Sequence, residues 1–110
     1  MNNNEKIMGF LGLCRRAGKL ACGHDAAKEA VTKEKAELVF LAKDASDRQK
    51  REMTHLCSLG DREISVIVTG LTMAEFDFGI GKRAGVYAVT DKGFANKLID
   101  MFREVFHEET

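Results

Sequence analysis

The sequence contains no proline, no tryptophan and one tyrosine, and its 17 Lys and Arg are balanced by 17 Asp and Glu among 110 residues. Its apolar runs are far shorter than the roughly 20 residues of a membrane-spanning helix, so no membrane association is expected. The first residues show no basic segment leading into an apolar stretch, so we see no secretory signal and expect a cytoplasmic protein. The zero net charge also argues against nucleic-acid binding, because phosphate recognition normally leaves an excess of Lys and Arg.

Cysteine is scarce and unpaired. The three residues Cys14, Cys22 and Cys57 are odd in number and form no CxxC pair, which excludes a disulfide framework and a zinc knuckle as natural interpretations. Cys22 and His24 offer two metal ligands, but a tetrahedral site needs two more. We therefore expect free thiols, no metal and no cofactor.

The composition is that of a folded chain, with 45% hydrophobic and 31% charged residues. No repeat, linker or low-complexity tract divides it, so residues 1–110 are expected to form a single domain. Apolar residues at helical spacing predict a first helix that Asn4 caps and Gly18 ends. A short strand within 19–22 follows, and Gly23 opens a second helix rich in small residues.

Three further strands are predicted over 37–42, 64–68 and 86–90, of which the first is nearly continuously apolar, as in a strand covered on both faces. Ser46 with Gln49 and Thr72 with Glu75 are predicted capping boxes of two more helices. The first of these helices should end at Gly60, and the second is short and gives way to a loop over 78–85.

Asp91 is expected to cap the last helix, whose apolar stripe should seal the other face of the sheet. Alternation of strands and helices predicts the α/β class, as a three-layer α/β/α sandwich around a small mixed sheet of about four strands.

The segment Gly79-Ile80-Gly81-Lys82 is similar to a nucleotide-binding glycine loop, but a helix precedes it and a strand follows. Phosphate loops need the opposite order, so that the phosphate meets the start of a helix, and nucleotide binding is not expected. Two interpretations stay open. The segment is either a flexible connection or a contact for an unstacked base and its phosphate, through Phe78, Ile80, Lys82 and Arg83.

Basic residues gather in Arg15-Arg16-Ala17-Gly18-Lys19, where cations also suit the end of a helix without any ligand. Residues 6–19 carry four cations and no acid, whereas residues 100–110 carry four acids and one cation, charges of +4 and −3. The zero total thus hides an asymmetry, and an asymmetric charge distribution steers ligands within a Debye length of about 10 Å.

The turn at 23–28 is either an ordinary helix start or a place where exposed N–H groups approach a nucleic-acid backbone. For an enzyme, the candidate acids and bases have no spacing that forces any two together, so no catalytic site is expected. They are His24, Asp25, Asp44, His55 and Asp91.

Several sequence segments, in the order in which they occur, resemble those of one family, the kink-turn RNA-binding family of ribosomal proteins named after the archaeal protein L7Ae. They are Gly23 at the second helix, 38–46, the loop around Gly79-Ile80-Gly81-Lys82, and 89–95. The segments 11–13, 16–19 and 90–95 are most similar to a bacterial member. The resemblance spans about residues 5–102.

The resemblance implies an α/β/α sandwich that binds a sharply bent RNA stem. In the family, the start of the second helix enters the groove at the kink, and the loop before the last strand covers a flipped-out nucleotide. The implied RNA-binding residues here are Arg16, Lys19, Gly23, His24, Asp25, Ala26, Lys28, Glu29, Lys43, Phe78, Ile80, Gly81, Lys82 and Arg83. Phe78 and Ile80 are the apolar candidates, and Lys82 is the phosphate contact.

The sequence departs from the family's phrase Gly-x-Asn-Glu-x-x-Lys, because Asp25, Ala26 and Glu29 stand at the last three named positions. Asp loses the N–H donors of Asn, Ala loses the acceptor of Glu, and Glu repels phosphate where Lys would attract it. Lys28 lies about 100° round the helix from position 29 and compensates in part. An altered or weak kink-turn is therefore the expected ligand.

Our hypothesis is a non-catalytic, monomeric RNA-binding protein, related to ribosomal proteins, whose partner is structured RNA such as rRNA and not DNA. The alternative is a protein-interaction module on the same fold, which would dock a partner at Glu104, Phe106, Glu108 and Glu109.

Overall fold

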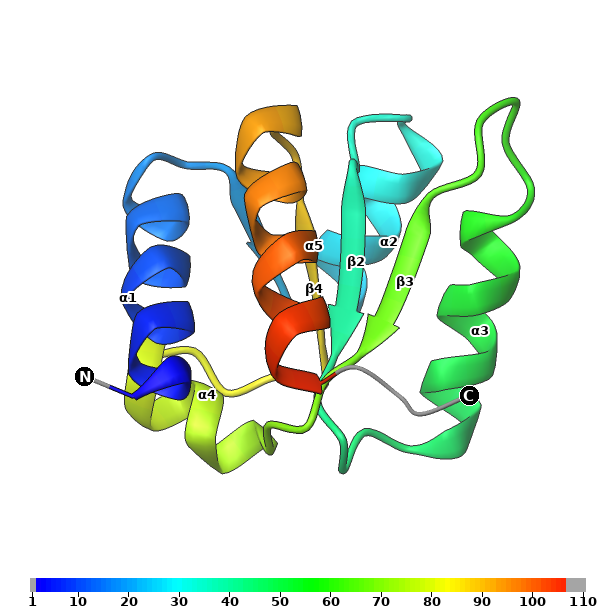
Figure 1. Cartoon of the computed structure of the whole chain (residues 1–110). Helices are drawn as coiled ribbons and strands as arrows, with labels where there is room; N and C mark the ends of the chain where they lie inside the picture. Colours follow the sequence, from blue (N-terminus) through cyan, green and yellow to red (C-terminus); the bar gives the residue numbers. More distant parts are fainter. Residues whose placement is uncertain (1, 107–110) are drawn as a thin grey trace.

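The structure is a computed structural model that describes residues 2–106. Helices and strands alternate through this part of the chain (Figure 1). The elements are α1 (Asn3–Arg16), β1 (Leu20–Cys22), α2 (His24–Thr32), β2 (Leu38–Leu41), α3 (Asp47–Cys57), β3 (Ser65–Val68), α4 (Met73–Ile80), β4 (Val86–Val89) and α5 (Lys92–Phe106). None of these helices is long and apolar enough to span a membrane.

The four strands form a mixed sheet in the order β1-β4-β2-β3. β4 runs antiparallel to both β1 and β2, and β2 runs parallel to β3. The two central strands are buried along their whole length, whereas β3 lies at an edge with Ser65 and Val68 exposed. This confirms the prediction of a small mixed sheet with 37–42 at its centre.

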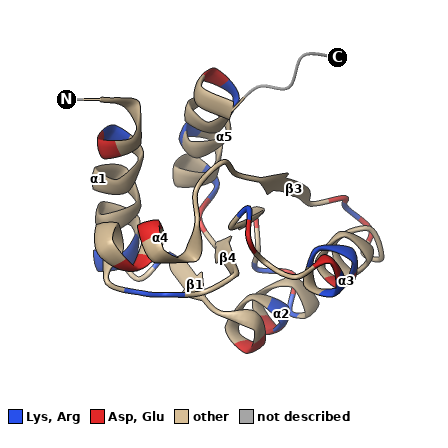
Figure 2. Ribbon diagram, turned by 90° about the horizontal axis from the view of Figure 1, so that it is seen from below, with Lys and Arg blue, Asp and Glu red and all other residues tan. Residues whose placement is uncertain are grey.

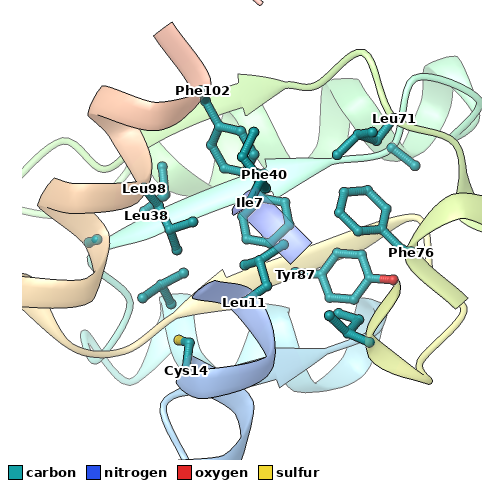
Figure 3. Close-up of a cluster of buried hydrophobic side chains, with 14 residues drawn as sticks. Ile7, Leu11, Cys14, Leu38, Phe40, Leu71, Phe76, Tyr87, Leu98 and Phe102 are labelled. Carbon is teal, nitrogen blue, oxygen red and sulfur yellow. The ribbon is translucent and has the colours of Figure 1, made fainter. Parts of the chain in front are cut away.

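Helices cover both faces of the sheet, which confirms the three-layer α/β/α sandwich. α1, α4 and α5 lie on one face, over an aromatic core in which the rings of Phe40, Phe76, Tyr87 and Phe102 contact one another (Figure 3). α2 and α3 lie on the other face, over a core of small and aliphatic side chains. The last helix thus shares its face with α1 and α4.

The helix starts agree with the predicted caps, with two corrections. Asn2 caps α1 rather than Asn4, because only Asn2 has a Glu three residues on, and the two exchange hydrogen bonds of 2.8 and 3.0 Å. Ser46 Oγ accepts from the Gln49 N–H at 3.0 Å, but the Gln49 side chain lies against Gly85 and does not return to complete the box.

The other two caps are confirmed. Thr72 and Glu75 form a complete capping box at the start of α4. Asp91 Oδ2 accepts from the Phe94 N–H at 2.9 Å in the first turn of α5.

The loop predicted over 78–85 is wrong in its first half, because α4 continues to Ile80. Gly79 suggested a turn, yet its place in the helix has a packing reason: a Cβ there would come within 2.5 Å of Met8 Sδ on α1. The helix ends at Gly81, whose φ of 74° is the left-handed conformation that favours glycine. α3, in contrast, is shorter than predicted, since it ends at Cys57 rather than at Gly60.

Candidate functional site

Three connecting segments lie side by side at one end of the sheet, where β1 and β2 end and β4 begins. The Gly23 N–H donates to the Val86 carbonyl at 2.9 Å, and the Ala42 N–H donates to the Gly85 carbonyl at 2.9 Å. These two hydrogen bonds join the start of α2, the loop after β2 and the loop before β4. The predicted site segments therefore share one edge of the molecule.

Gly23 turns the chain from β1 into α2. Its φ of 99° and ψ of 166° lie in a region that is essentially restricted to glycine. α2 begins when the Ala27 N–H donates to the Gly23 carbonyl at 2.9 Å, and within residues 2–106 no side chain caps its first N–H groups. Such a helix start combines free donors with the positive end of the helix dipole, which suits an anion.

Most side chains of the first α2 turns face outward, whereas Ala27 is buried against the sheet. Asp25, Ala26, Lys28 and Glu29 are exposed, and His24 is half-buried. The charge of Glu29 is partly offset by Lys33, whose Nζ lies 3.1 Å from Glu29 Oε2. The acid that stands at the family's Lys position is therefore held in an ion pair along the helix.

Tyr87 anchors the loop before β4 through two hydrogen bonds. Its hydroxyl donates to the Lys82 carbonyl and accepts from the Ala84 N–H at 3.1 Å. The Lys82 and Arg83 side chains are exposed. An anchored backbone thus presents two cations to solvent.

Arg15 connects the end of α1 to this loop. Its Nη1 donates to the Ile80 carbonyl at 2.9 Å, at the end of α4. Burial raises the pKa of the Cys22 thiol, and the charges of Arg15 and Lys82 partly oppose that rise. Both cations therefore act at the end of β1, next to Gly23. Figure 2, seen from below, shows α1, α4 and α5 on one side of the sheet and α2 and α3 on the other.

Lys43 lies at the same end of the sheet, exposed on the loop after β2. Its backbone is held by a bond of 2.8 Å from its N–H to the Leu71 carbonyl. Its carbonyl accepts from Lys50 Nζ at 3.0 Å. The loop after β2 thus adds a cation to the edge formed by the other two segments.

Lys19 lies at the other end of β1. Its carbonyl accepts from the Thr90 N–H at 2.9 Å, whereas Gly23 pairs with Val86. Residues 20–22 lie between the two positions, which are therefore four residue rises of a strand, about 13 Å, apart. Arg16 is exposed in the last turn of α1, in the segment that leads to Lys19. These two cations flank the site and do not form part of its centre.

The side chains of Phe78 and Ile80, the two apolar candidates, are not placed as the resemblance implies. Ile80 is 6% exposed and packs in the aromatic core, so its side chain is not available to a base. Phe78 is 96% exposed, but it lies in a groove with Met8 and the first turn of α1. Both results follow from the continuation of α4, which turns these side chains to opposite sides of a helix.

Sequence reasoning missed the roles of Arg15 and Tyr87. Arg15 was visible as one of several cations, but its bond to residue 80 spans 65 positions. Tyr87 was visible as the single tyrosine of a predicted buried strand, and a buried hydroxyl needs a partner. Neither observation in the sequence identifies the residue with which the Arg15 or Tyr87 side chain forms its hydrogen bond.

The site holds backbone N–H donors and exposed cations, which are groups that bind anions. Within residues 2–106 no three His, Cys, Asp or Glu side chains come together to hold a metal ion. Burial is the main cause that raises the pKa of the Cys14 and Cys57 thiols to about 11, so both remain protonated at neutral pH. A thiol in that state is a poor nucleophile.

The alternative docking edge at the C-terminus is only partly described. Glu104 is exposed, whereas Phe106 is half-buried, with its ring 6.0 Å from that of Phe102. Glu108 and Glu109 lie outside the described residues.

Comparison with known sequences gives a consistent result. The model of the ribosomal protein L7Ae/L30e/S12e/Gadd45 family matches residues 5–99. A protein of Enterococcus faecium named RNA-binding protein YlxQ is 35% identical over 95 residues, 86% of this chain and 89% of that protein. The Bacillus subtilis protein of the same name is 36% identical over 93 residues, 84% and 90% of the two chains. The resemblance to a bacterial member of this family is confirmed.

Two solved structures share the fold. A protein of unknown function from Bacillus halodurans is 33% identical, with a TM-score of 0.79 over 88% of this chain and 96% of that one. A 15.5 kD RNA-binding protein of Giardia lamblia is 17% identical, with a TM-score of 0.66 over 92% of this chain and 84% of that one. At that identity, the second likeness concerns the fold alone.

Proposed function

Since this chain belongs to the ribosomal protein L7Ae/L30e/S12e/Gadd45 family, we propose that it is a non-catalytic RNA-binding protein whose ligand is a structured, kink-turn-like RNA. Two curated relatives that it matches over most of its length are named RNA-binding proteins, which supports RNA as the ligand class. The site supports the same class, because it offers hydrogen-bond donors and cations on exposed segments.

The observation that carries this proposal is the uncapped start of α2 beside Arg15 and Lys82. The N–H groups of the first α2 turn donate to a phosphate or base edge, and the helix dipole favours the negative charge. Lys82 and Arg83 bind phosphates on the other side of the bend. Arg83 also offers a guanidinium plane on which an unpaired base can stack.

The side chains at the start of α2 weaken base-specific recognition. Asp25 only accepts hydrogen bonds, Ala26 has no polar group, and Glu29 is engaged by Lys33. Backbone donors and cations recognise the shape and the phosphates of a bent stem without identifying its bases. We therefore propose recognition of bent RNA with modest affinity.

Titration tests the proposal. A kink-turn RNA, the same stem without its bulge, and rRNA fragments are titrated with the full chain at two salt concentrations. Lys82→Ala with Arg83→Ala should lower the affinity for all three, while Lys92→Ala with Lys97→Ala, the same loss of charge on α5, should change it little. Absence of any binding below about 100 µM at low salt, the weak end of non-specific binding, would exclude an RNA-binding function.

A second experiment tests the kink-turn itself. The variant Asp25→Asn, Ala26→Glu, Glu29→Lys restores the family's phrase, and each restored hydrogen-bonding pair with a base is worth about 1–3 kcal/mol. The bulged RNA should bind at least about tenfold more tightly and the unbulged stem should change much less. Glu52→Lys on α3 changes the net charge by the same amount and serves as the control. An equal increase in affinity for both RNAs would mean that α2 does not read the kink.

A further inference from the structure

A groove between α1 and α4 has features of a second binding surface. It has a volume of about 440 Å³ and is lined by Met8, Leu71, Ala74, Phe78 and Gly79, with Asn4 at its rim. It faces the first turns of α1, whereas the proposed RNA site lies at the last turn of α1, at Arg15. We call it the α1/α4 groove.

Phe78 is the most exposed large apolar side chain in residues 2–106. Its 96% exposure compares with 63% for Leu59 and 48% for Leu13. It contributes little to the core, yet it stands beside an apolar groove. Exposed aromatic rings next to such grooves are typical anchors of protein–protein contacts.

The two helices that form the groove are closely packed. Gly79 lets α4 approach α1 so closely that a Cβ would come within 2.5 Å of Met8 Sδ. Both helices begin in complete capping boxes, at Asn2 and Thr72. A preformed surface loses little conformational entropy when a partner binds.

The charge of the groove is negative. Glu5 and Glu75 line it, and no Lys or Arg is among its lining residues. Each carboxylate uses Oε1 in its capping box, and neither Oε2 has a hydrogen-bond partner within the described part of the chain. A further acid, Asp77, is exposed on α4. These acids repel RNA phosphates and attract Lys or Arg side chains.

From this combination we propose that the α1/α4 groove binds a segment of another protein that carries one large apolar side chain flanked by Lys or Arg. The apolar side chain fills the groove against Phe78 and Met8. The cations pair with the free oxygens of Glu5 and Glu75. This binding is separate from the proposed RNA function and leaves the start of α2 free.

A random peptide library displayed on phage tests the proposal, with selection on the full chain and counter-selection on Phe78→Ser. Enriched peptides should combine an aromatic or long aliphatic residue with at least two cations. A synthetic copy of such a peptide should bind Phe78→Ser about tenfold more weakly, as expected for the loss of an aromatic anchor. Leu59→Ser, which removes another exposed apolar side chain, should leave the affinity unchanged.

The carboxylates are tested by Glu5→Gln and Glu75→Gln. Gln keeps the capping box and removes the charge, so each variant should stay folded and lose about threefold in peptide affinity. Urea unfolding checks the stability of all variants. Phe78 and both acids are exposed, so unfolding is not expected to confuse the result.

Four results would overturn the proposal. One is the enrichment of acidic or uncharged peptides, or of none. A second is an affinity that Phe78→Ser leaves unchanged. A third is a loss of kink-turn RNA binding in Phe78→Ser, which would assign the groove to RNA. The fourth is self-association of the chain that Phe78→Ser abolishes, since the occupant would then be a second copy.

Discussion

Substitution of Gly23 by Ala isolates the backbone conformation on which the start of α2 depends. An added Cβ at this position meets no atom within 4 Å, so the variant creates no steric overlap with the rest of the protein. The cost comes from the backbone alone, because φ of 99° with ψ of 166° is a conformation that costs a non-glycine residue about 1–3 kcal/mol. We expect the free energy of unfolding to fall by that amount.

Gly9 provides a matched control. It lies in α1, is exposed, and an added Cβ there also meets no atom within 4 Å. Its φ is not in the left-handed region, and Ala in a helix interior is more stable than Gly by about 0.5–1 kcal/mol. The same chemical change should therefore stabilise the protein at Gly9 and destabilise it at Gly23.

Equilibrium urea unfolding measures both variants. The midpoints should move in opposite directions with an unchanged slope, since neither variant alters the surface exposed on unfolding. Gly23→Ala should also weaken RNA binding, because relief of the strain shifts the first N–H groups of α2, whereas Gly9→Ala should not. If Gly23→Ala unfolds at the wild-type midpoint or above it, the assigned conformation of the turn is incorrect.

Three further predictions concern the same structure. Tyr87→Phe removes both hydrogen bonds to the loop before β4 and should lower the free energy of unfolding by about 1–3 kcal/mol and weaken RNA binding, as measured by urea unfolding and RNA titration. Burial raises the pKa of Cys14 and Cys57 to about 11 and that of Tyr87 to about 12, so the fold favours the protonated groups. Urea titrations at several pH values should show this stability complete below pH 9 and lost as the pH rises through 11 and 12. Arg15→Ala should reduce RNA affinity more than Arg16→Ala in the same titration, because only Arg15 is bonded to the end of α4.

The sheet and its layers could be predicted because their signal is local. The run 37–42 is almost entirely apolar, and its length of six residues is typical of a strand covered on both faces. The caps at Thr72 and Asp91 could be predicted because their signal is also local, since a capping residue and its partner are three positions apart. Asn2 was missed in favour of Asn4 although the signal was also local, since of the three asparagines in a row only Asn2 has a Glu three residues on.

The end of α4 could not be predicted because its cause is not local. Gly79 usually indicates a turn, and only the contact with Met8, 71 positions earlier, explains a glycine inside this helix. The error carried over to the candidate site, since a loop would have exposed the side chains of both Phe78 and Ile80 there. Gly23 was placed correctly, because a glycine between a strand and a helix is informative without knowledge of distant contacts.

The zero net charge of the chain has a specific consequence for the proposed RNA site. The cations near the start of α2 are Lys28 on the helix itself, Arg15, Lys82 and Arg83, with Lys43 on the adjacent loop. If they neutralise about three phosphates, the logarithm of the binding constant should fall with the logarithm of salt concentration with a slope of about −2 to −3. Such a slope is small for a nucleic-acid-binding protein. If the chain binds RNA as proposed, its affinity at physiological salt comes mainly from backbone donors of α2 that fit a bent stem, so this protein should discriminate RNAs by shape more than by charge density.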